Sequence, residues 1–284
     1  MIKTYLELCK VRLSFFSAFS AATGFILAGT NVTIQIMFTI SGVLLLACGS
    51  CALNQYQERQ IDSLMDRTKN RPIPSGRIKP LHALYFSLLL LLAGFSILIF
   101  TGSLPAFLLG VGAVLLYNGV YTYLKRKTAF ASVPCAVIGA ISPAIGWFAG
   151  GGQFPDRHIL AVCFLFYIWQ ITHFWLLFLS HGKDYEKAGL PSLTKLFAGR
   201  QLERIVFIWL FATAVATLLT SLYGLFTSRA VNILLFAVAI WLIWNGIKLL
   251  SRKSQNVFAY HSAFINMNTY ILLVMTLLII DSVI

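Results

Sequence analysis

The sequence predicts an all-α, polytopic membrane protein in which about nine transmembrane helices form one bundle. Hydrophobic residues make up 58% of the chain and charged residues only 11%, whereas about 25% of the residues of a soluble domain are charged. Apolar segments of about 20 residues, the length that crosses a bilayer, recur along the whole chain. Lys and Arg are concentrated in every second one of the polar segments between them.

The apolar segments set the expected helices. They cover residues 13–30, 33–53, 81–101, 104–124, 133–151, 159–180, 204–226, 231–250 and 262–281. The first follows three basic residues, as in a signal peptide, but no small-x-small cleavage site is visible, so we expect a retained helix. We therefore expect residues 1–284 to form a single transmembrane domain.

The distribution of basic residues predicts the topology. Of the 22 Lys and Arg, all except Arg157 and Arg229 lie before the first span or after an even-numbered one. The positive-inside rule then predicts a cytoplasmic N-terminus and a C-terminus on the far side. The net charge of +13 is explained by this topology, so it does not indicate nucleic-acid binding. The two long loops at about 54–80 and 181–203 are expected on the cytoplasmic side, and they hold most of the acids.

A row of polar residues follows the second span. Asn54, Glu58, Asp62 and Asp66 are four residues apart, which places them on one face if the helix continues. Stacked carboxylates repel one another unless cations lie between them. Mg²⁺ is commonly held by one or two carboxylates together with substrate phosphates, so the row is a candidate metal site for a diphosphate.

A basic run follows the acidic row and is a candidate anion site. Its members are Arg67, Lys69, Arg71, Arg77 and Lys79. Arginine binds phosphate oxygens through two parallel hydrogen bonds, and we expect Arg67 and Arg71 to act in this way. The alternative is a solvated loop in which Arg59 and Arg67 pair with Glu58 and Asp62. The positive-inside rule accounts for the bases but not for the acids beside them.

A second constellation surrounds the end of the sixth span. His173 lies inside the span, where an ionisable residue is a functional candidate by default. Lys183 and Asp184 follow it on the side of the first row, where Asp184 is placed to complete a metal cluster opposite Asp62. The alternatives are a helix-packing role for His173 and a loop ion pair between Asp184 and Lys187.

Two further segments have both a structural and a functional interpretation. Lys125 and Arg126 end the fourth span behind Tyr117 and Tyr121. They either anchor the helix at the interface or contact phosphate. The segment 139–147 contains two glycines and a proline, which favours close helix packing; the alternative is a cavity wall for a long or flat ligand.

These stretches, in this order, resemble the UbiA superfamily of intramembrane prenyltransferases. The motifs that carry the resemblance are 54–77, 121–128, 142–147, 173–175 and 184–191. Within the superfamily their combination is most similar to the branch that farnesylates haem. The chain departs from the common pattern in having Glu58 where Asp is frequent, and in having Asp184 without a second Asp beside it.

The resemblance implies a UbiA-like bundle in the inner membrane that transfers a farnesyl group from farnesyl diphosphate to a vinyl group of haem b, assisted by Mg²⁺. It implies metal ligation by Asn54, Glu58, Asp62 and Asp184, which with His173 form the catalytic set. It implies a diphosphate site formed by Arg59, Arg67, Lys69, Arg71, Lys125, Arg126 and Lys183. The implied partners are the two substrates, membrane lipid and a downstream haem-modifying enzyme or terminal oxidase, without nucleic acid.

Other functions remain open from the sequence. An enzyme of the same class would use a different acceptor, such as an aromatic acid, a quinone precursor or a chlorin. A transporter is disfavoured because its ionisable groups tend to lie near the bilayer midplane, whereas the acids here gather at one rim. A non-catalytic assembly factor for haem proteins would not depend on a metal.

Overall fold

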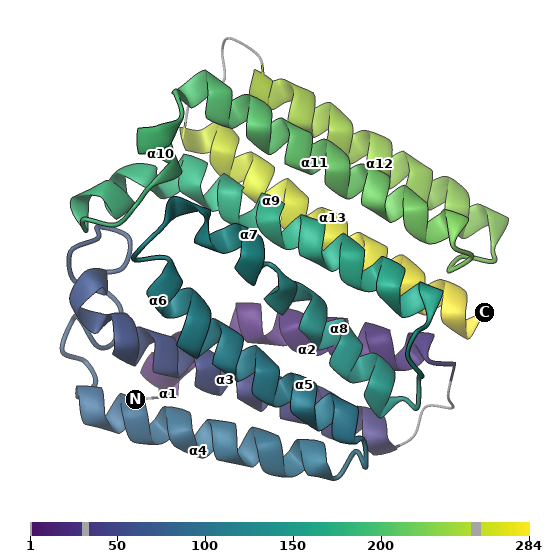
Figure 1. Cartoon of the computed structure of the whole chain (residues 1–284), viewed down its shortest axis with the longest axis horizontal. Coiled ribbons are helices and arrows are strands. Elements are labelled where there is room, and N and C mark those ends of the chain that lie inside the picture. Colours follow the sequence, from purple (N-terminus) through teal and green to yellow (C-terminus); the bar gives the residue numbers. More distant parts are fainter. Residues whose placement is uncertain (1, 30–33, 251–256) are drawn as a thin grey trace. The chain divides into compact units, whose positions relative to one another are not determined.

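The computed structural model describes residues 2–29, 34–250 and 257–284, and all regular elements within these ranges are helical (Figure 1). Arg252 and Lys253, which the charge distribution assigns to a cytoplasmic loop, lie outside the described residues. The chain divides into two compact units. Unit 1 contains Met1–Ala131, Ile141–Gln153 and Asp184–Pro191, and unit 2 contains Ser132–Ala140, Phe154–Lys183 and Ser192–Ile284.

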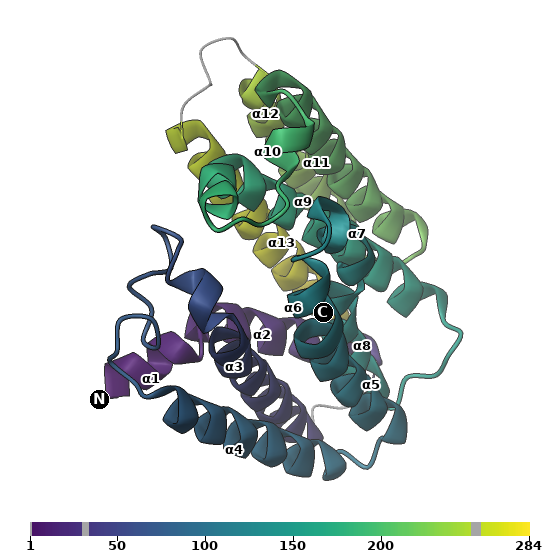
Figure 2. The ribbon, with the colours of Figure 1, turned by 60° about the vertical axis from the view of Figure 1, so that its left-hand side comes forward.

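Unit 1 is built around α3, which packs against α1, α2 and α4 (Figure 2). Its elements are α1 (Ile2–Leu8), α2 (Val11–Leu27), α3 (Ile34–Asp62), α4 (Pro80–Ile99), α5 (Leu104–Val114), the π-helical turn η1 (Leu115–Tyr121), α6 (Thr122–Leu124), the 3-10 turn η2 (Ala129–Ala131) and most of α8 (Val137–Ala149). Side chains such as Phe25, Leu46 and Leu98 form its apolar core.

Unit 2 consists of the remaining helices, among which α12 packs against both α11 and α13. Its elements are α7 (Ser132–Cys135), most of α9 (Arg157–Lys187), α10 (Leu193–Leu196), α11 (Gly199–Leu222), α12 (Arg229–Leu250) and α13 (Val257–Val283). Helix α9 is interrupted at His181, whose φ of −132° and ψ of 15° are not helical. The segment Asp184–Pro191, which directly follows Lys183, belongs to unit 1.

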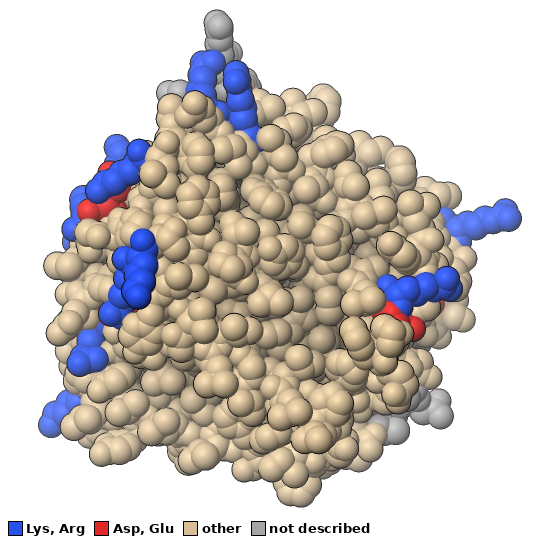
Figure 3. All heavy atoms as spheres, viewed as in Figure 1, with Lys and Arg blue, Asp and Glu red and all other residues tan. Residues whose placement is uncertain are grey.

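Eight helical segments of the described chain are long and apolar enough to cross a membrane. They are Ile34–Asp62, Pro80–Ile99, Leu104–Leu124, Ala129–Ala149, Arg157–Lys187, Gly199–Leu222, Arg229–Leu250 and Ala259–Val283. Helix α2 is also apolar but has 17 residues. Most of the surface seen in Figure 3 is uncharged, as expected where lipid replaces water. The predicted all-α membrane architecture is confirmed.

Helices α2 and α8 cross closely at two glycines. A Cβ atom on Gly146 would lie 1.8 Å from the main-chain oxygen of Ala21, and one on Gly24 would lie 1.9 Å from that of Pro143. At these distances only the hydrogen atom of glycine fits in place of a Cβ atom at either position. Small residues at helix crossings let backbones approach in membranes, where packing replaces the hydrophobic effect as the driving force. The packing interpretation of the segment 139–147 is therefore confirmed at Gly146.

Candidate active site

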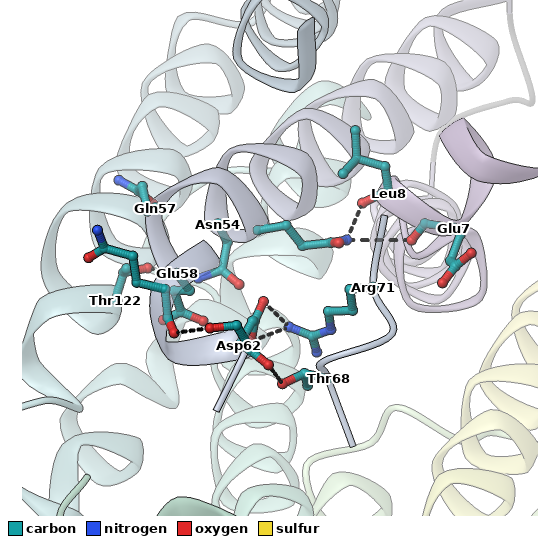
Figure 4. Close-up of polar contacts among 12 residues, drawn as sticks. Glu7, Leu8, Asn54, Gln57, Glu58, Asp62, Thr68, Arg71 and Thr122 are labelled. Atoms are coloured by element: carbon teal, nitrogen blue, oxygen red, sulfur yellow. Dashed lines mark hydrogen bonds and ion pairs between the residues drawn. The ribbon is translucent and has the colours of Figure 1, made fainter. Parts of the chain in front are cut away.

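The polar row on α3 is buried inside unit 1. Helix α3 continues past the apolar span to Asp62, so Asn54, Glu58 and Asp62 share one face through the four-residue spacing. Their exposed fractions are only 3%, 3% and 2%. Figure 4 shows the three side chains projecting from successive turns of α3. Burying two carboxylates is costly unless cations compensate them.

Asp66 does not belong to this row, which corrects the sequence expectation. The helix ends at Asp62, and the Thr68 hydroxyl donates to the main-chain oxygen of Asp62 at 2.8 Å, capping a carbonyl that the helix leaves open. Asp66 lies beyond this end, with its side chain 53% exposed and paired with Lys69 and Lys187. The hydrogen bonds from those two ammonium groups lower the pKa of Asp66 to about 2.

Arg71 neutralises Asp62. Its Nη1 atom donates to both carboxylate oxygens, at 2.9 and 2.8 Å, and only 19% of its side chain is exposed. Figure 4 shows the guanidinium pointing from the loop toward the end of α3. The sequence alternative paired Asp62 with Arg67, but the described contact is made by the next arginine, which directly precedes Pro72.

Lys125 neutralises Glu58. The Nζ atom lies 2.5 Å from Glu58 Oε1, with 13% of the Lys125 side chain exposed. Lys125 follows η1 and α6, and π-helical turns of this kind are frequent at functional sites. On the preceding turn, Thr122 Oγ1 accepts a hydrogen bond from Asn54 Nδ2 at 3.1 Å. Two residues at the end of the Leu104–Leu124 segment, Thr122 and the adjoining Lys125, thus contact Asn54 and Glu58 of the row.

Asp184 reaches the loop that follows α3. Its Oδ2 atom accepts a hydrogen bond from the main-chain N–H of Arg67 at 3.1 Å. Three residues later along the chain, Lys187 forms its ion pair with Asp66, so the expected Asp184–Lys187 pair is not the contact described. This hydrogen bond joins the Asp184–Pro191 segment to the loop after α3 within unit 1, and the convergence of Asp184 and Asp62 on a metal stays a prediction.

The other predicted phosphate-binding residues have varied settings. Arg59 donates to the Tyr56 oxygen at 2.8 Å and covers the Tyr56 ring. Arg126 donates to the Gln57 oxygen at 3.1 Å. Lys69 pairs with Asp66, while Arg67 and Lys183 are exposed. Their roles at a diphosphate stay predictions.

Lys10 is a basic residue near the α3 row that sequence reasoning did not single out. It lies between α1 and α2, half-buried, within electrostatic range of Glu58, Asp62 and Arg71. Burial, followed by the charge of Arg71, lowers the pKa of Lys10 to about 8, against the opposing effect of the two carboxylates. In the sequence, Lys10 is indistinguishable from the other basic residues that precede the first span.

The donor set suits a hard divalent cation. Asn54, Glu58 and Asp62 offer oxygen atoms on one buried helix face, and Mg²⁺ prefers such ligands. The buried Asn118 Oδ1 and Gln55 Oε1 atoms accept no hydrogen bond from the described residues, which leaves further oxygen acceptors for an ion or its waters. Within the described chain no three His, Cys, Asp or Glu side chains form a metal cage by themselves, so substrate oxygens would have to complete the coordination.

His173 lies in unit 2 in an aromatic setting. Its Nδ1 atom is 3.0 Å from Asn268 Oδ1, and its ring centroid is 5.4 Å from that of Trp169 and 4.7 Å from that of Phe264. An amide oxygen at Nδ1 selects the tautomer that carries its proton there. Nε2 then keeps its lone pair, and it makes no hydrogen bond to a described residue. The expected helix-packing contact and a functional role are therefore compatible.

Residues 17–268 match the UbiA prenyltransferase family, and the chain belongs to this family. It is therefore an integral, multi-pass membrane protein of the prenyltransferase class. The fold and the acidic row described above agree with this assignment, which was expected from the motifs.

Among curated proteins, the chain is similar to several named protoheme IX farnesyltransferase. It is 34% identical to that of Nitratidesulfovibrio vulgaris (strain DP4), covering 96% of this chain and 93% of the relative. It is 37% identical to that of Geobacter sulfurreducens, covering 81% of this chain and 84% of the relative. The protein of that name from Cronobacter sakazakii is 34% identical over 90% of this chain and 86% of its own length.

Solved structures share the fold. A digeranylgeranylglyceryl phosphate synthase has a TM-score of 0.75 at 18% identity, with 99% of this chain and 98% of the other covered. A UbiA homologue from Archaeoglobus fulgidus, bound to DMAPP and Mg²⁺, has a TM-score of 0.69 at 18% identity, with 96% and 99% covered. At these identities the likeness concerns the fold alone.

Proposed function

We propose that the protein transfers a farnesyl group from farnesyl diphosphate to a vinyl group of protohaem IX, giving haem O. The observation that carries the proposal is the buried row on α3, in which Asp62 and Glu58 are each neutralised by one basic side chain. The arrangement belongs to a UbiA prenyltransferase whose curated relatives are named protoheme IX farnesyltransferase. Those relatives supply the donor and the acceptor of the proposal.

Asn54, Glu58 and Asp62 would hold Mg²⁺ together with the diphosphate, and Asp184 would contribute from the second acidic segment. Bound there, Mg²⁺ supplies Lewis-acid neutralisation of the charge that develops on the leaving group. Arg71 and Lys125 exchange their carboxylate partners for diphosphate oxygens, and arginine matches phosphate geometry well. Because this exchange takes place when the donor binds, both cations already contact the diphosphate before the C1–O bond breaks, and they stabilise the charge that develops on the leaving group.

The reaction breaks the donor C1–O bond, the vinyl π bond and one O–H bond of water, and it forms one C–C and one C–O bond while the proton passes to solvent. The C1–O bond of the donor ionises, and its electron pair leaves with the diphosphate. The vinyl group of the haem attacks C1 of the farnesyl cation. Water adds to the cation formed on the vinyl carbon and loses a proton, which yields a hydroxyethylfarnesyl substituent. Exclusion of bulk water from the site would delay capture of the first cation.

We assign His173 to the acceptor. The Asn268 contact holds the imidazole with its Nδ1 engaged, and flat aromatic rings surround it. Planar aromatic surfaces of this kind stack favourably on a porphyrin. The free Nε2 is then available to the haem or to the captured water.

We further propose that the chain forms a single transmembrane prenyltransferase domain in the cell's inner membrane. The N-terminus and the active-site loops at 54–80 and 181–203 would be cytoplasmic and the C-terminus on the far side, as the basic residues indicate. The farnesyl tail, being hydrocarbon, would enter from the lipid. The product would pass to a haem-modifying enzyme or a terminal oxidase.

Mass spectrometry of haem tests the proposal directly. Purified protein in lipid nanodiscs is incubated with farnesyl diphosphate, haem b and Mg²⁺, and the porphyrins are extracted. The expected product is haem carrying one added farnesyl group and one added hydroxyl group, and it should be absent with the Asp62→Asn variant. Parallel incubations with labelled donor and an aromatic acid, a quinone precursor or a chlorin test the other acceptors. Transfer to one of these but not to haem would refute the proposed acceptor.

A further inference from the structure

The junction between α1 and α2 has a backbone conformation that its residue does not favour. Lys10 has φ 46° and ψ 53°, the left-handed region. Within the described residues every other positive φ belongs to a glycine, including Gly76 and Gly102. Lys10 occupies the position after the end of α1 where helices usually place glycine, because glycine has no Cβ to clash there. A lysine held in this way points to a functional demand on the side chain.

The junction is fixed against α3 beside the acidic row. Gln55 Nε2 donates to the Leu8 oxygen at 2.8 Å, and Gln55 directly follows Asn54 in α3. The Ser14 hydroxyl donates to the Cys9 oxygen at 2.8 Å. Leu8 is fully buried in a small core with Ala52 and others. Hydrogen bonds to the main-chain oxygens of Leu8 and Cys9 therefore fix the backbone that precedes Lys10.

The Lys10 ammonium group has no counter-ion of its own. It forms no ion pair and no side-chain hydrogen bond with a described residue, yet it interacts electrostatically with Glu58 and Asp62. Those carboxylates are already paired with Lys125 and Arg71. The centre thus has three cations for two carboxylates, and the unmatched, half-buried cation makes the centre attractive to an anion.

We infer that Lys10 binds the diphosphate of the prenyl donor, as a third cation that the N-terminal junction supplies to the α3 row. The inference rests on the proposed function for the identity of the anion. The left-handed backbone at Lys10 is kept at a cost in stability that glycine would avoid. Topology alone explains basic residues near the N-terminus, but not this conformation or the burial.

The substitution Lys10→Gly separates the two explanations. Glycine adopts the junction's conformation without strain, so the unfolding temperature without ligand should equal or exceed that of the wild type. Losing a charge-assisted contact should raise the KM for farnesyl diphosphate about tenfold or more, with an unchanged KM for haem. Lys10→Arg should recover part of the loss. Arg12→Ala is the matched control, because Arg12 is exposed on α2.

Binding of inorganic pyrophosphate gives a readout that does not need turnover. Pyrophosphate with Mg²⁺ should raise the unfolding temperature of the wild type and of Arg12→Ala, but much less that of Lys10→Gly. A full shift in Lys10→Gly, or an equal loss in Arg12→Ala, would overturn the inference. A wild type that binds pyrophosphate but makes no farnesylated haem would refute the proposed function and leave the role of Lys10 standing.

Discussion

Arg71 Nη1 donates hydrogen bonds to both carboxylate oxygens of Asp62, the last residue of the acidic row on α3. The Asp62 side chain is almost wholly buried and that of Arg71 largely so. The Asp62 carboxylate and the Arg71 guanidinium therefore neutralise each other, shielded from water, until a ligand supplies each of them with another partner of opposite charge. A diphosphate with its divalent ion is such a set, since it offers an anion to the arginine and a cation to the aspartate.

Removing Arg71 should destabilise the metal-free protein. Arg71→Ala leaves a buried carboxylate without its cation, which costs about 3 kcal/mol or more. Added Mg²⁺ should raise the unfolding temperature of this variant more than that of the wild type, because the ion replaces the lost positive charge. Thermal unfolding with and without Mg²⁺ measures both effects. Asp66→Asn, in the exposed Lys69 pair, is the control; an equal response in it would contradict a specific site.

Lys125 and Arg126 should differ sharply although they are neighbours. Lys125→Met removes the cation beside Glu58 and should raise the KM for farnesyl diphosphate about tenfold. Arg126→Ala removes a contact to the Gln57 main chain and should change it little. Steady-state kinetics at saturating haem make the comparison. Equal losses in the two variants would contradict a special role of the Lys125–Glu58 pair at the diphosphate.

Turnover should depend on a divalent ion. Oxygen ligands of the row favour Mg²⁺, so a membrane-permeant chelator should stop product formation and added Mg²⁺ should restore it. The measurement is farnesylated haem per unit time in nanodiscs. Activity that persists after complete chelation would exclude the proposed role of the α3 carboxylates, whatever the acceptor.

His173→Ala should affect the acceptor more than the donor. The variant should keep the pyrophosphate-induced rise in unfolding temperature but form little product, because the Asn268-oriented ring is lost. Asn268→Ala should give a smaller defect, since the imidazole remains but is no longer oriented. Absorbance titration with haemin measures acceptor binding. His261→Ala, an exposed histidine of α13, is the control, and normal activity of His173→Ala would restrict His173 to helix packing.

Gly146→Ala should loosen the α2–α8 crossing without touching the site. The added methyl group would meet the Ala21 oxygen at 1.8 Å, so the backbones must separate, at a cost of about 1–3 kcal/mol. The unfolding temperature of this variant in detergent should be lower than that of the wild type, while its activity per folded molecule should be unchanged. Gly112→Ala is the control because a Cβ there meets nothing within 4 Å. An unchanged unfolding temperature in Gly146→Ala would show that the crossing adapts.

The membrane class and the acidic row could be predicted from the sequence because both depend on local spacing. Hydrophobic length predicts the spans, and the four-residue interval of Asn54, Glu58 and Asp62 predicts a shared helix face. The same interval wrongly added Asp66, because the sequence does not show that Thr68 caps the helix at Asp62. A helix end depends on the contacts of the loop beyond it.

The sequence by itself thus determined an all-helical membrane chain with acids and bases collected in two loops, since bilayer thickness and helical pitch act on neighbouring residues. Only the tertiary structure decided that Asp62 pairs with Arg71, that Glu58 pairs with Lys125, and that Asp184 meets the Arg67 main chain. It alone revealed Lys10, because its unfavourable backbone angle and its approach to the row arise from helix packing. Pairings between distant segments depend on that packing, which no local pattern encodes.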